Sequence, residues 1–493
     1  MQTSFKKFVS SKWLLDQFVH RLIAVYEAKI PLFKKMGELV RAVNQQGLDD
    51  KIITQKQLDL LNQIMHGAIR VASVDELKMF RKIFAVMSLY PHGYYDLRNN
   101  ILCHSTAFRD VRGLYFRMFN SVLDLERVDK KHKAFVKKII SARRPFSSAL
   151  IDVVEKFDKQ GALTHPQAEV FLSELVALLS RPKKSVLTKA EYSQLGNIHV
   201  VLTQILASGK PCGNHLTYNT WDMFVVQKMM RKWGIEDNMT VTGGAKDFRN
   251  LLHQHACLAP EIVMDFLTDD KKGYVSGKYA EEFIEIEARH TAVSRFGYAT
   301  YTQCLINAKN KVSLLAKEDK DVYAKAYYAE LAKSFEIFPR DVKLQILHGL
   351  GYYKFKPSKK GLMTDIGVRQ KMNMRELVVN DFFDWEPIPY KDFIAVSATE
   401  IFNANIGLGL KFSGEQVDLN QFNYLLKEPK KMKLESLFEP APAKSEGQLS
   451  LESAMECDII DPFIEDRDEQ WATIVNSCLE MGIDVRQATG LSA

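Results

Sequence analysis

Apolar residues recur at helical spacing over long stretches of the chain. They lie three or four residues apart over 13–26, over 32–43 and again over 322–335. Such spacing places them on one face of a helix, and Pro31 stands where a second helix can begin. We therefore predict two helices that meet at Pro31, the second ending near Gly47, and a further helix in the last third of the chain.

Three short patterns predict helix starts. A Ser or Thr is followed three residues later by Glu or Gln at 73–76, 164–167 and 188–191. In this arrangement each side chain satisfies a backbone N–H in the first turn of a helix. The first of these helices follows a short extended segment over 68–72. The region from about 113 to 207 is predicted to be mostly helical.

Other segments read as strands. At 283–287, Ile284 and Ile286 alternate with Phe283, Glu285 and Glu287, which is the period of a strand. Residues 213–217 and 393–397 are also predicted to be extended. Residues 94–109 mix aromatic and polar side chains, and the pattern leaves open whether they form a solvated loop or a pocket wall.

Composition limits the class of protein. The chain has 493 residues, 46% hydrophobic and 26% charged, which is ordinary for a globular protein. Its formal net charge of +7 comes from basic residues interleaved with acidic ones. That distribution does not favour nucleic-acid binding, and no apolar run is long enough to predict a membrane span.

Cysteine usage and the N-terminus bear on localisation. The six cysteines are scattered without Cys-x-x-Cys spacing, which predicts neither a zinc knuckle nor a disulfide framework. The first residues carry Lys6, Lys7 and Lys12 but also Asp16. We predict a cytoplasmic protein, with an organellar presequence as the less favoured alternative.

Candidate chemistry begins with His66 and Arg70. If their segment is extended, both face the same side, because they are four residues apart. An imidazole beside a guanidinium suits a metal that holds a carboxylate substrate. His215 and Glu285, each in an extended segment, complete a two-histidine, one-carboxylate set of the kind that binds non-haem Fe(II). Spacing alone does not select this triple, since the chain has 12 histidines.

Five motifs follow one another along the chain. They are Met65-His66-Gly67-Ala68-Ile69-Arg70-Val71, Tyr94-Tyr95-Asp96-Leu97, His104-Ser105-Thr106-Ala107-Phe108-Arg109, Asn214-His215-Leu216-Thr217 and Val396-Ser397-Ala398. In this order they resemble the 2-oxoadipate dioxygenase/decarboxylase family, which is distantly similar to the vicinal-oxygen-chelate dioxygenases. The resemblance extends over most of the chain, from Leu15 to Trp471.

The resemblance implies an α+β fold, with a curved, mostly antiparallel sheet of vicinal-oxygen-chelate type that holds a metal and is wrapped by many helices. It implies Fe(II) as the cofactor, with His66, His215 and Glu285 as ligands. Glu285 is chosen because relatives place the ligand four residues before the arginine, here Arg289, and Glu287 is the alternative. Ile284 stands where the family pattern leads us to expect Gly, which makes this strand bulkier.

The remaining site residues follow from the same resemblance. Arg70 is expected to bind a substrate carboxylate and to act in catalysis. Val396 and Ser397 are expected to line the substrate pocket, and His104, Arg109 and Glu287 are further pocket candidates.

The implied reaction converts 2-oxoadipate and O2 to 2-hydroxyglutarate and CO2, as in lysine catabolism. Two alternatives stay open: a metal-dependent isomerase or lyase that uses the same site, and a non-catalytic helical scaffold. The partners would be a 2-oxo dicarboxylic acid and O2, without nucleic acid or membrane. The sequence does not determine the exact 2-oxo acid, the product chirality or the oligomeric state.

We predict one large catalytic domain over 1–471. It would contain the helical insertion at about 113–207 and an exposed excursion rich in Lys, Pro, Ala, Ser and Glu at about 427–447. A tail helix over 472–493 would complete the chain.

Overall fold

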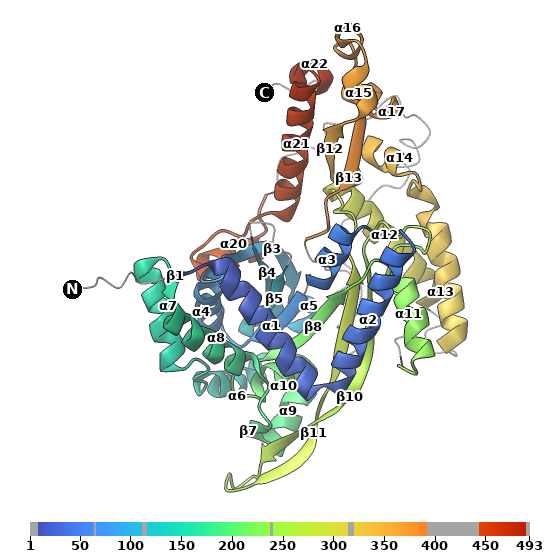
Figure 1. Ribbon diagram of the computed structural model, residues 1–493. Coiled ribbons are helices and arrows are strands. Elements are labelled where there is room, and N and C mark those ends of the chain that lie inside the picture. The colour runs from blue at the N-terminus through green and yellow to red at the C-terminus, as the bar shows by residue number, and fades with distance from the viewer. Residues whose placement is uncertain are drawn as a thin grey trace, which may run out of the picture.

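The protein is a mixed α+β molecule built around one large sheet (Figure 1). The computed structural model describes residues 8–63, 66–110, 116–236, 240–313, 320–391 and 443–489. No helix in these ranges is both long and apolar enough to cross a membrane. The predicted strand at 393–397 and most of the predicted excursion at 427–447 lie outside the described residues.

The central sheet has nine strands in the order β3-β4-β5-β2-β8-β11-β10-β7, with β9 paired to β10. Five of its pairings are antiparallel and three are parallel, so the prediction of a mostly antiparallel sheet is confirmed. The strands are β2 (His66–Val71), β3 (Leu89–Leu97), β4 (Cys103–Asp110), β5 (Arg117–Leu123), β7 (Lys184–Thr188), β8 (Gly213–Asn219), β9 (Thr242–Gly243), β10 (His253–Leu267) and β11 (Tyr274–Ala288).

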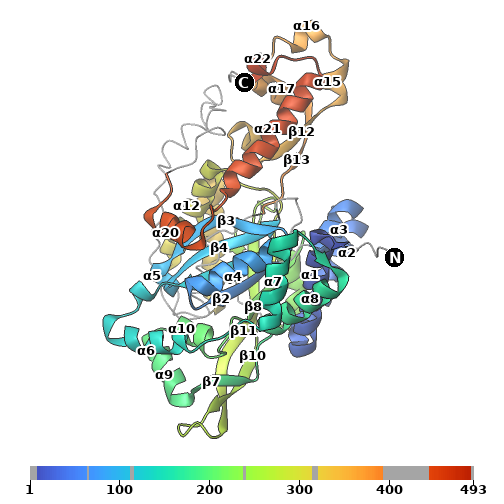
Figure 2. The ribbon, with the colours of Figure 1, turned by 90° about the vertical axis from the view of Figure 1, so that its left-hand side faces the viewer.

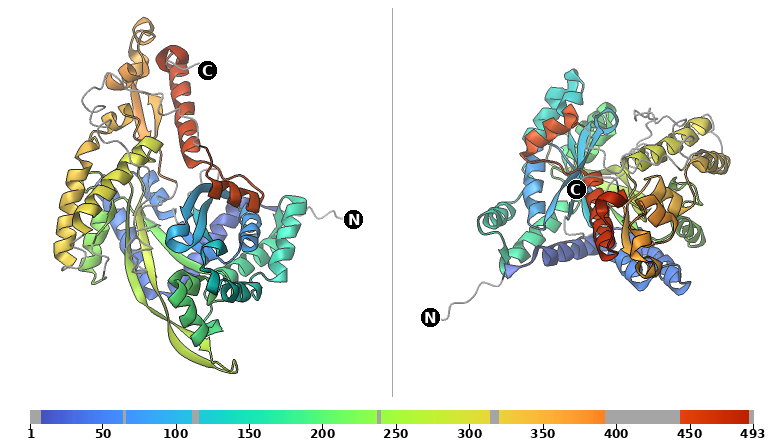
Figure 3. Two further views of the ribbon diagram at one scale, coloured as in Figure 1. Left: turned by 180° about the vertical axis from the view of Figure 1, so that it is seen from behind. Right: turned by 90° about the horizontal axis from the view of Figure 1, so that it is seen from above.

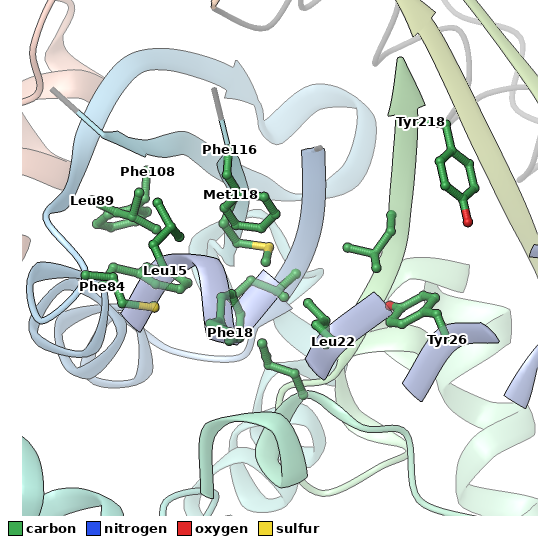
Figure 4. Packing of buried hydrophobic residues seen from close by; sticks show 14 of the residues in the cluster. Leu15, Phe18, Leu22, Tyr26, Phe84, Leu89, Phe108, Phe116, Met118 and Tyr218 are labelled. Atoms are coloured by element: carbon green, nitrogen blue, oxygen red, sulfur yellow. The ribbon is translucent and has the colours of Figure 1, made fainter. Parts of the chain in front are cut away.

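One face of the sheet is apolar and carries the main core. Ile69, Met118 and Leu216 project from this face into a cluster that helices cover from outside. Figure 4 shows Phe18 and Leu22 of the first helix against Met118 and Phe116. The helices of this layer are α1 (Ser11–Lys29), α2 (Pro31–Asp49), α4 (Val74–Ala85), α7 (Ser148–Gln160), α8 (His165–Leu179) and α11 (Met223–Lys232).

These helices begin where the sequence predicts. Pro31 is the first residue of α2, and the capping boxes at Thr164 and Thr188 are both formed. At α4 the capping box is only half formed. Ser73 caps the helix, but the Glu76 carboxylate accepts from the Ala72 N–H and from Arg143 instead of the Ser73 N–H. The arginine comes from a distant segment, which a local pattern cannot include.

The opposite face of the sheet is partly covered by a second layer. Ala68, Phe119 and Ala107 lie on this face in a smaller apolar cluster. Figure 2 shows this helical layer on the side of the strands away from α1. Its helices are α6 (Lys130–Ser141), α9 (Lys189–Ile198) and α10 (Val200–Leu206). This layer leaves polar side chains at the centre of the same face, and the candidate site lies there.

Two expectations about the first half of the chain can be compared with the structure. The question left open for residues 94–109 is decided against a solvated loop, because β3 and β4 pair along this stretch. Helices predominate in the described part of 113–207, as predicted, but β5 interrupts them and lies in the sheet between β4 and β2. The sequence did not reveal these strands, because strand pairing here joins segments whose local composition is too polar to signal burial.

The strands β10 and β11 form a long hairpin of 15 residues on each side, which extends past the other strands (Figures 1 and 3). The strand predicted at 283–287 is the end of β11 that lies inside the sheet. This end pairs with β8 over 285–287, so Glu285 and Glu287 are carried into the interior.

The remaining elements pack beside this sheet or project beyond it (Figure 1). The helix predicted at 322–335 is α13. Helix α21 runs unbroken across the boundary between 471 and 472, where the tail helix was expected to begin. The division into domains stays a prediction. These elements are β1 (Phe8–Val9), α3 (Gln55–Gln63), α5 (Arg98–Ile101), η1 (Leu125–Arg127), β6 (Leu163–Thr164), α12 (Arg295–Val312), α13 (Lys320–Ser334), η3 (Phe335–Ile337), α14 (Val342–Leu347), β12 (Tyr353–Pro357), α15 (Lys359–Met363), α16 (Ile366–Arg369), α17 (Met374–Val379), β13 (Phe383–Pro387), α20 (Glu446–Met455), α21 (Pro462–Glu480) and α22 (Val485–Thr489).

Candidate metal centre

Three buried side chains meet on the polar face of the sheet. One donor atom each from His66, His215 and Glu285 lies within 4.8 Å of the other two. All three residues are at most 3% exposed. Within the described ranges this is the only group of three or more such side chains close enough to share an ion.

Strand register explains why residues so far apart in sequence come together. His66 of β2 pairs with Thr217 of β8, and Thr217 in turn pairs with Glu285 of β11. Directly paired residues share a face of the sheet, and so do residues two apart on one strand. His215, two residues before Thr217, therefore lies on the same face as His66 and Glu285.

The donor set suits a divalent metal. Burial lowers the pKa of His66 to about 4, so its imidazole is neutral near pH 7 and has a lone pair to offer. Burial alone would raise the pKa of Glu285, but the charge and hydrogen bond of His215 outweigh it and hold that pKa below its ordinary value. Two imidazoles and one carboxylate match a facial ligand set.

Glu285 is positioned by two neighbours. Its Oε2 lies 3.2 Å from Nε2 of His215 and accepts a hydrogen bond of 2.8 Å from the Thr217 hydroxyl. A hydrogen bond such as the one from Thr217 holds a ligand carboxylate in one orientation. Nε2 is therefore the His215 nitrogen that faces the candidate metal position.

Glu287 is in a different environment, although it lies on the same face of β11. Arg117 bonds its Oε1, and Nη2 of Arg289 lies 2.5 Å from its Oε2. Burial would raise the pKa of Glu287, but Arg289 and Arg117 hold it well below the ordinary value. The same carboxylate lies 3.8 Å from Nδ1 of His66. Glu287 therefore lies on the Nδ1 side of His66, between the guanidinium groups of Arg117 and Arg289.

Arg70 lies on the same strand and face as His66. The residue is 7% exposed, and its Nη1 donates to Oε1 of Gln204 at 2.5 Å and to Oδ1 of Asn214 at 2.9 Å. Burial lowers the pKa of Arg70 to about 10, which leaves it charged at neutral pH. Both of these acceptors are neutral amides, so they orient the guanidinium without cancelling its charge.

The other expected pocket residues divide between the two faces of β4. Arg109 is buried, pairs in register with Arg117 and forms an ion pair with Glu465 of α21. His104 faces the other side, where its Nδ1 lies 2.8 Å from the Tyr94 hydroxyl. The structure therefore does not bring His104 to the histidine pair. Val396 and Ser397 lie outside the described residues.

Sequence reasoning missed the surroundings of the site. Three residues that contact a predicted site residue were not singled out: Arg117, Gln204 and Glu465. Thr217, which bonds Glu285, was named only as part of a motif. For Arg117 a signal was present, since it is a charged residue at the start of the strand 117–123. Gln204 and Glu465 lie on helices whose sequences give no such sign.

Comparison with known proteins identifies the family. A family model described as 2-oxoadipate dioxygenase/decarboxylase matches residues 18–405. A relative of that name from Pseudomonas putida is 30% identical over 414 residues, which cover 81% of this chain and 88% of the relative. One from Escherichia coli is 28% identical over 415 residues, covering 81% of this chain and 89% of the relative.

A solved structure is similar over nearly the whole chain. It is the hydroxyglutarate synthase of Pseudomonas putida in complex with 2-oxoadipate, with a TM-score of 0.76 and 25% sequence identity. The match covers 96% of this chain and 99% of that one, so the α+β fold is shared over nearly the whole chain. Since the family model also spans well over half of the residues, this chain belongs to the 2-oxoadipate dioxygenase/decarboxylase family.

Proposed function

We propose that this enzyme uses Fe(II) to convert 2-oxoadipate and O2 to 2-hydroxyglutarate and CO2. The observation that carries the proposal is the buried group of His66, His215 and Glu285 with Arg70 on the same sheet face. It is supported by relatives named for this activity and by a structurally similar hydroxyglutarate synthase that holds 2-oxoadipate. The reaction balances, because C1 of 2-oxoadipate leaves as CO2 with its own two oxygen atoms. Both atoms of O2 are then in 2-hydroxyglutarate, one in the new carboxylate and one in the hydroxyl group.

We assign His66, His215 and Glu285 as the metal ligands. Glu285 is preferred over Glu287, because it lies beside His215, whereas Glu287 is bonded to two arginines. Three protein ligands on one face leave positions for substrate and oxygen, and iron when bound supplies the oxygen-activating chemistry. The protein contributes a buried site, two imidazoles and a fixed carboxylate.

Arg70 is assigned to bind a carboxylate of the substrate. Its guanidinium is buried and charged, and two amide oxygens aim it. A guanidinium can form two parallel hydrogen bonds with a carboxylate, which sets the direction of a diacid in the site. Val396 and Ser397 stay predicted pocket residues.

Oxygen uptake tests the reaction. The protein is loaded anaerobically with Fe(II), and 2-oxoadipate is then added in oxygenated buffer. We expect consumption of O2 and 2-oxoadipate in equal amounts, with matching release of CO2 and 2-hydroxyglutarate. Loss of 2-oxoadipate at the same rate without O2 would instead favour the lyase or isomerase alternative. No turnover at full iron occupancy would contradict the proposed function.

Metal content tests the ligands separately. His66→Ala and His215→Ala are each expected to lower bound iron to a small fraction of the wild-type value, since each removes one of three ligands. His20→Ala, which changes an exposed histidine of α1, is the matched control and is expected to keep full metal content. Unchanged iron in either site variant would contradict the assignment.

A further inference from the structure

Asn214 contacts the candidate metal ligand and the candidate substrate clamp with opposite ends of one amide. Its Oδ1 accepts from Nη1 of Arg70 at 2.9 Å, and its Nδ2 lies 3.0 Å from Nδ1 of His215. The pairing of β2 with β8 is irregular here, passing from Ala68–His215 to Ile69–Gly213. Asn214 is the residue passed over, so its side chain reaches a position that a regular strand residue would not occupy.

Arg70 determines which way this amide points. A guanidinium has only donors, so the oxygen of Asn214 must face Arg70 and the NH2 group must face His215. Nδ2 of the amide can only donate, and Nδ1 of His215 must therefore accept. The ring proton is then on Nε2, which lies 3.2 Å from Oε2 of Glu285.

A metal requires the opposite arrangement of His215. Nε2 faces the metal position, and coordination uses its lone pair, so the ring proton must be on Nδ1. An Nδ1–H needs an acceptor, which Asn214 provides only if its amide turns around. The turned amide presents Nδ2 to Arg70, and two donors then face each other. Nη1 of Arg70 must leave Asn214, while Gln204 still accepts from it.

We propose that Asn214 is a positioning residue that couples metal binding at His215 to the release of Arg70 for a substrate carboxylate. This inference rests on the proposed function of His215 and Arg70. It predicts an order of events in which the metal binds first and the diacid second. Without metal, Asn214 holds one of the N–H groups that the substrate needs.

The test measures two affinities by calorimetry, those of Co(II) and of adipate. Adipate is a diacid without the keto oxygen, and its affinity is measured with and without Co(II). The ratio of the two adipate affinities is the coupling between the sites. We expect wild-type protein to bind adipate more tightly when Co(II) is present.

Two substitutions at Asn214 are expected to act in opposite ways. Asn214→Ala removes the acceptor for His215 and frees Arg70. Co(II) affinity should fall about 10- to 100-fold, while adipate affinity without metal rises about three- to tenfold. Asn214→Asp offers oxygen to both neighbours, so Co(II) affinity should be retained while adipate affinity falls with and without metal. Circular dichroism of each variant establishes that it is folded.

Gln204→Ala is the matched control. It removes the other acceptor of the same Arg70 nitrogen but does not touch His215. Co(II) affinity and the coupling ratio should both stay at the wild-type values. Equal coupling in wild type and Asn214→Ala would overturn the inference, as would equal loss of coupling in Gln204→Ala.

The experiment separates this inference from the proposed function. If wild-type protein does not bind Co(II), or if His215→Ala binds it as tightly, the metal site itself is wrong. If wild-type protein binds both ligands and the Asn214 variants behave like it, only the role of Asn214 is wrong. If Asn214→Asp loses Co(II) as Asn214→Ala does, the hydrogen-bond argument fails.

Discussion

At the scale of single residues, the site depends on which charges lie beside one another in the interior. Glu285 and Glu287 are chemically identical and both are 1% exposed. One lies beside His215 and Thr217, and the other between Arg117 and Arg289. A buried carboxylate between two guanidinium groups stays ionised and compensates their charge, which suits it to support His66 and not to replace Glu285.

Glu287→Gln is expected to destabilise the protein at neutral pH. The substitution leaves two buried arginines without their shared carboxylate, a loss of about 3–5 kcal/mol in unfolding free energy. Because the pKa of Glu287 is well below its ordinary value in the folded state, its contribution is present above about pH 4.5 and is lost as the pH falls further. The difference in unfolding free energy between wild type and Glu287→Gln should therefore become smaller at acidic pH. Urea unfolding between about pH 3 and pH 7 measures it, and a constant gap would contradict the ionised state of Glu287.

Arg70→Lys is expected to affect substrate binding more than metal binding. Lysine keeps the charge but has no planar fork for a carboxylate, and it cannot bond Gln204 and Asn214 in the same geometry. We expect KM for 2-oxoadipate to rise about 10- to 100-fold, with iron content unchanged. Steady-state oxygen uptake measures KM. A variant with wild-type KM would exclude Arg70 as the clamp.

At the scale of elements, close contact between helices and the sheet depends on small residues. Gly37 of α2 faces Tyr218 of β8, and a Cβ at this position would lie 2.6 Å from the tyrosine hydroxyl. That hydroxyl donates to the Phe33 carbonyl. The Phe33 and Tyr218 rings are stacked, with their centroids 4.6 Å apart. Gly37 therefore sets the distance at which α2 packs behind the strand that carries His215.

A matched pair of glycine substitutions tests this contact. In a helix interior, alanine is favoured over glycine by about 1 kcal/mol. Gly196 of α9 has only a Thr203 methyl at 3.6 Å, so Gly196→Ala should stabilise the protein. At Gly37 the clash should outweigh the helical preference and cost about 1–3 kcal/mol. Thermal unfolding compares the melting temperatures of Gly37→Ala and Gly196→Ala. Equal changes in melting temperature would mean that the Tyr218 side chain moves away from residue 37 without cost in stability.

At the scale of the whole molecule, the C-terminal region completes the sheet. It lies beyond residue 405, where the family match ends. Ile460 exchanges two backbone hydrogen bonds of 2.9 Å with Pro91 and Gly93 on the edge strand β3. Glu465 then reaches over this edge to Arg109 and lies 3.5 Å from Nε2 of His92. The edge strand is thus covered, and a buried arginine on the site face is neutralised from outside the matched region.

Glu465→Gln is expected to lower the unfolding free energy by about 2 kcal/mol, since it leaves the buried Arg109 with a weaker, neutral acceptor. Glu456→Gln is the control, because the Lys78–Glu456 pair joins the same two regions at the exposed surface. The control should not change stability measurably. Urea unfolding measures the unfolding free energy of both variants. An equal change in the two would mean that the Glu465–Arg109 pair stabilises the protein no more than the exposed Lys78–Glu456 pair.

Much of the local structure was predictable from the sequence. The starts of α2, α8 and α9 follow from Pro31, Thr164 and Thr188, because these signals act within a few residues. Alternation around Ile284 and Ile286 likewise predicts the inner end of β11. The order of five motifs led to His66 and His215 through resemblance and not through spacing.

Only the tertiary structure decided which glutamate lies beside the histidines. Two residues that are two apart on a strand share a face, so no local pattern distinguishes Glu285 from Glu287. The difference comes from β8 on one side and from Arg117 of β5 on the other, which are distant in sequence. The sequence by itself determined that the first motif, residues 65–71, places His66 and Arg70 on one side of a strand. The assembled sheet decided what each of them meets there, because buried charges are set by neighbours that only folding brings together.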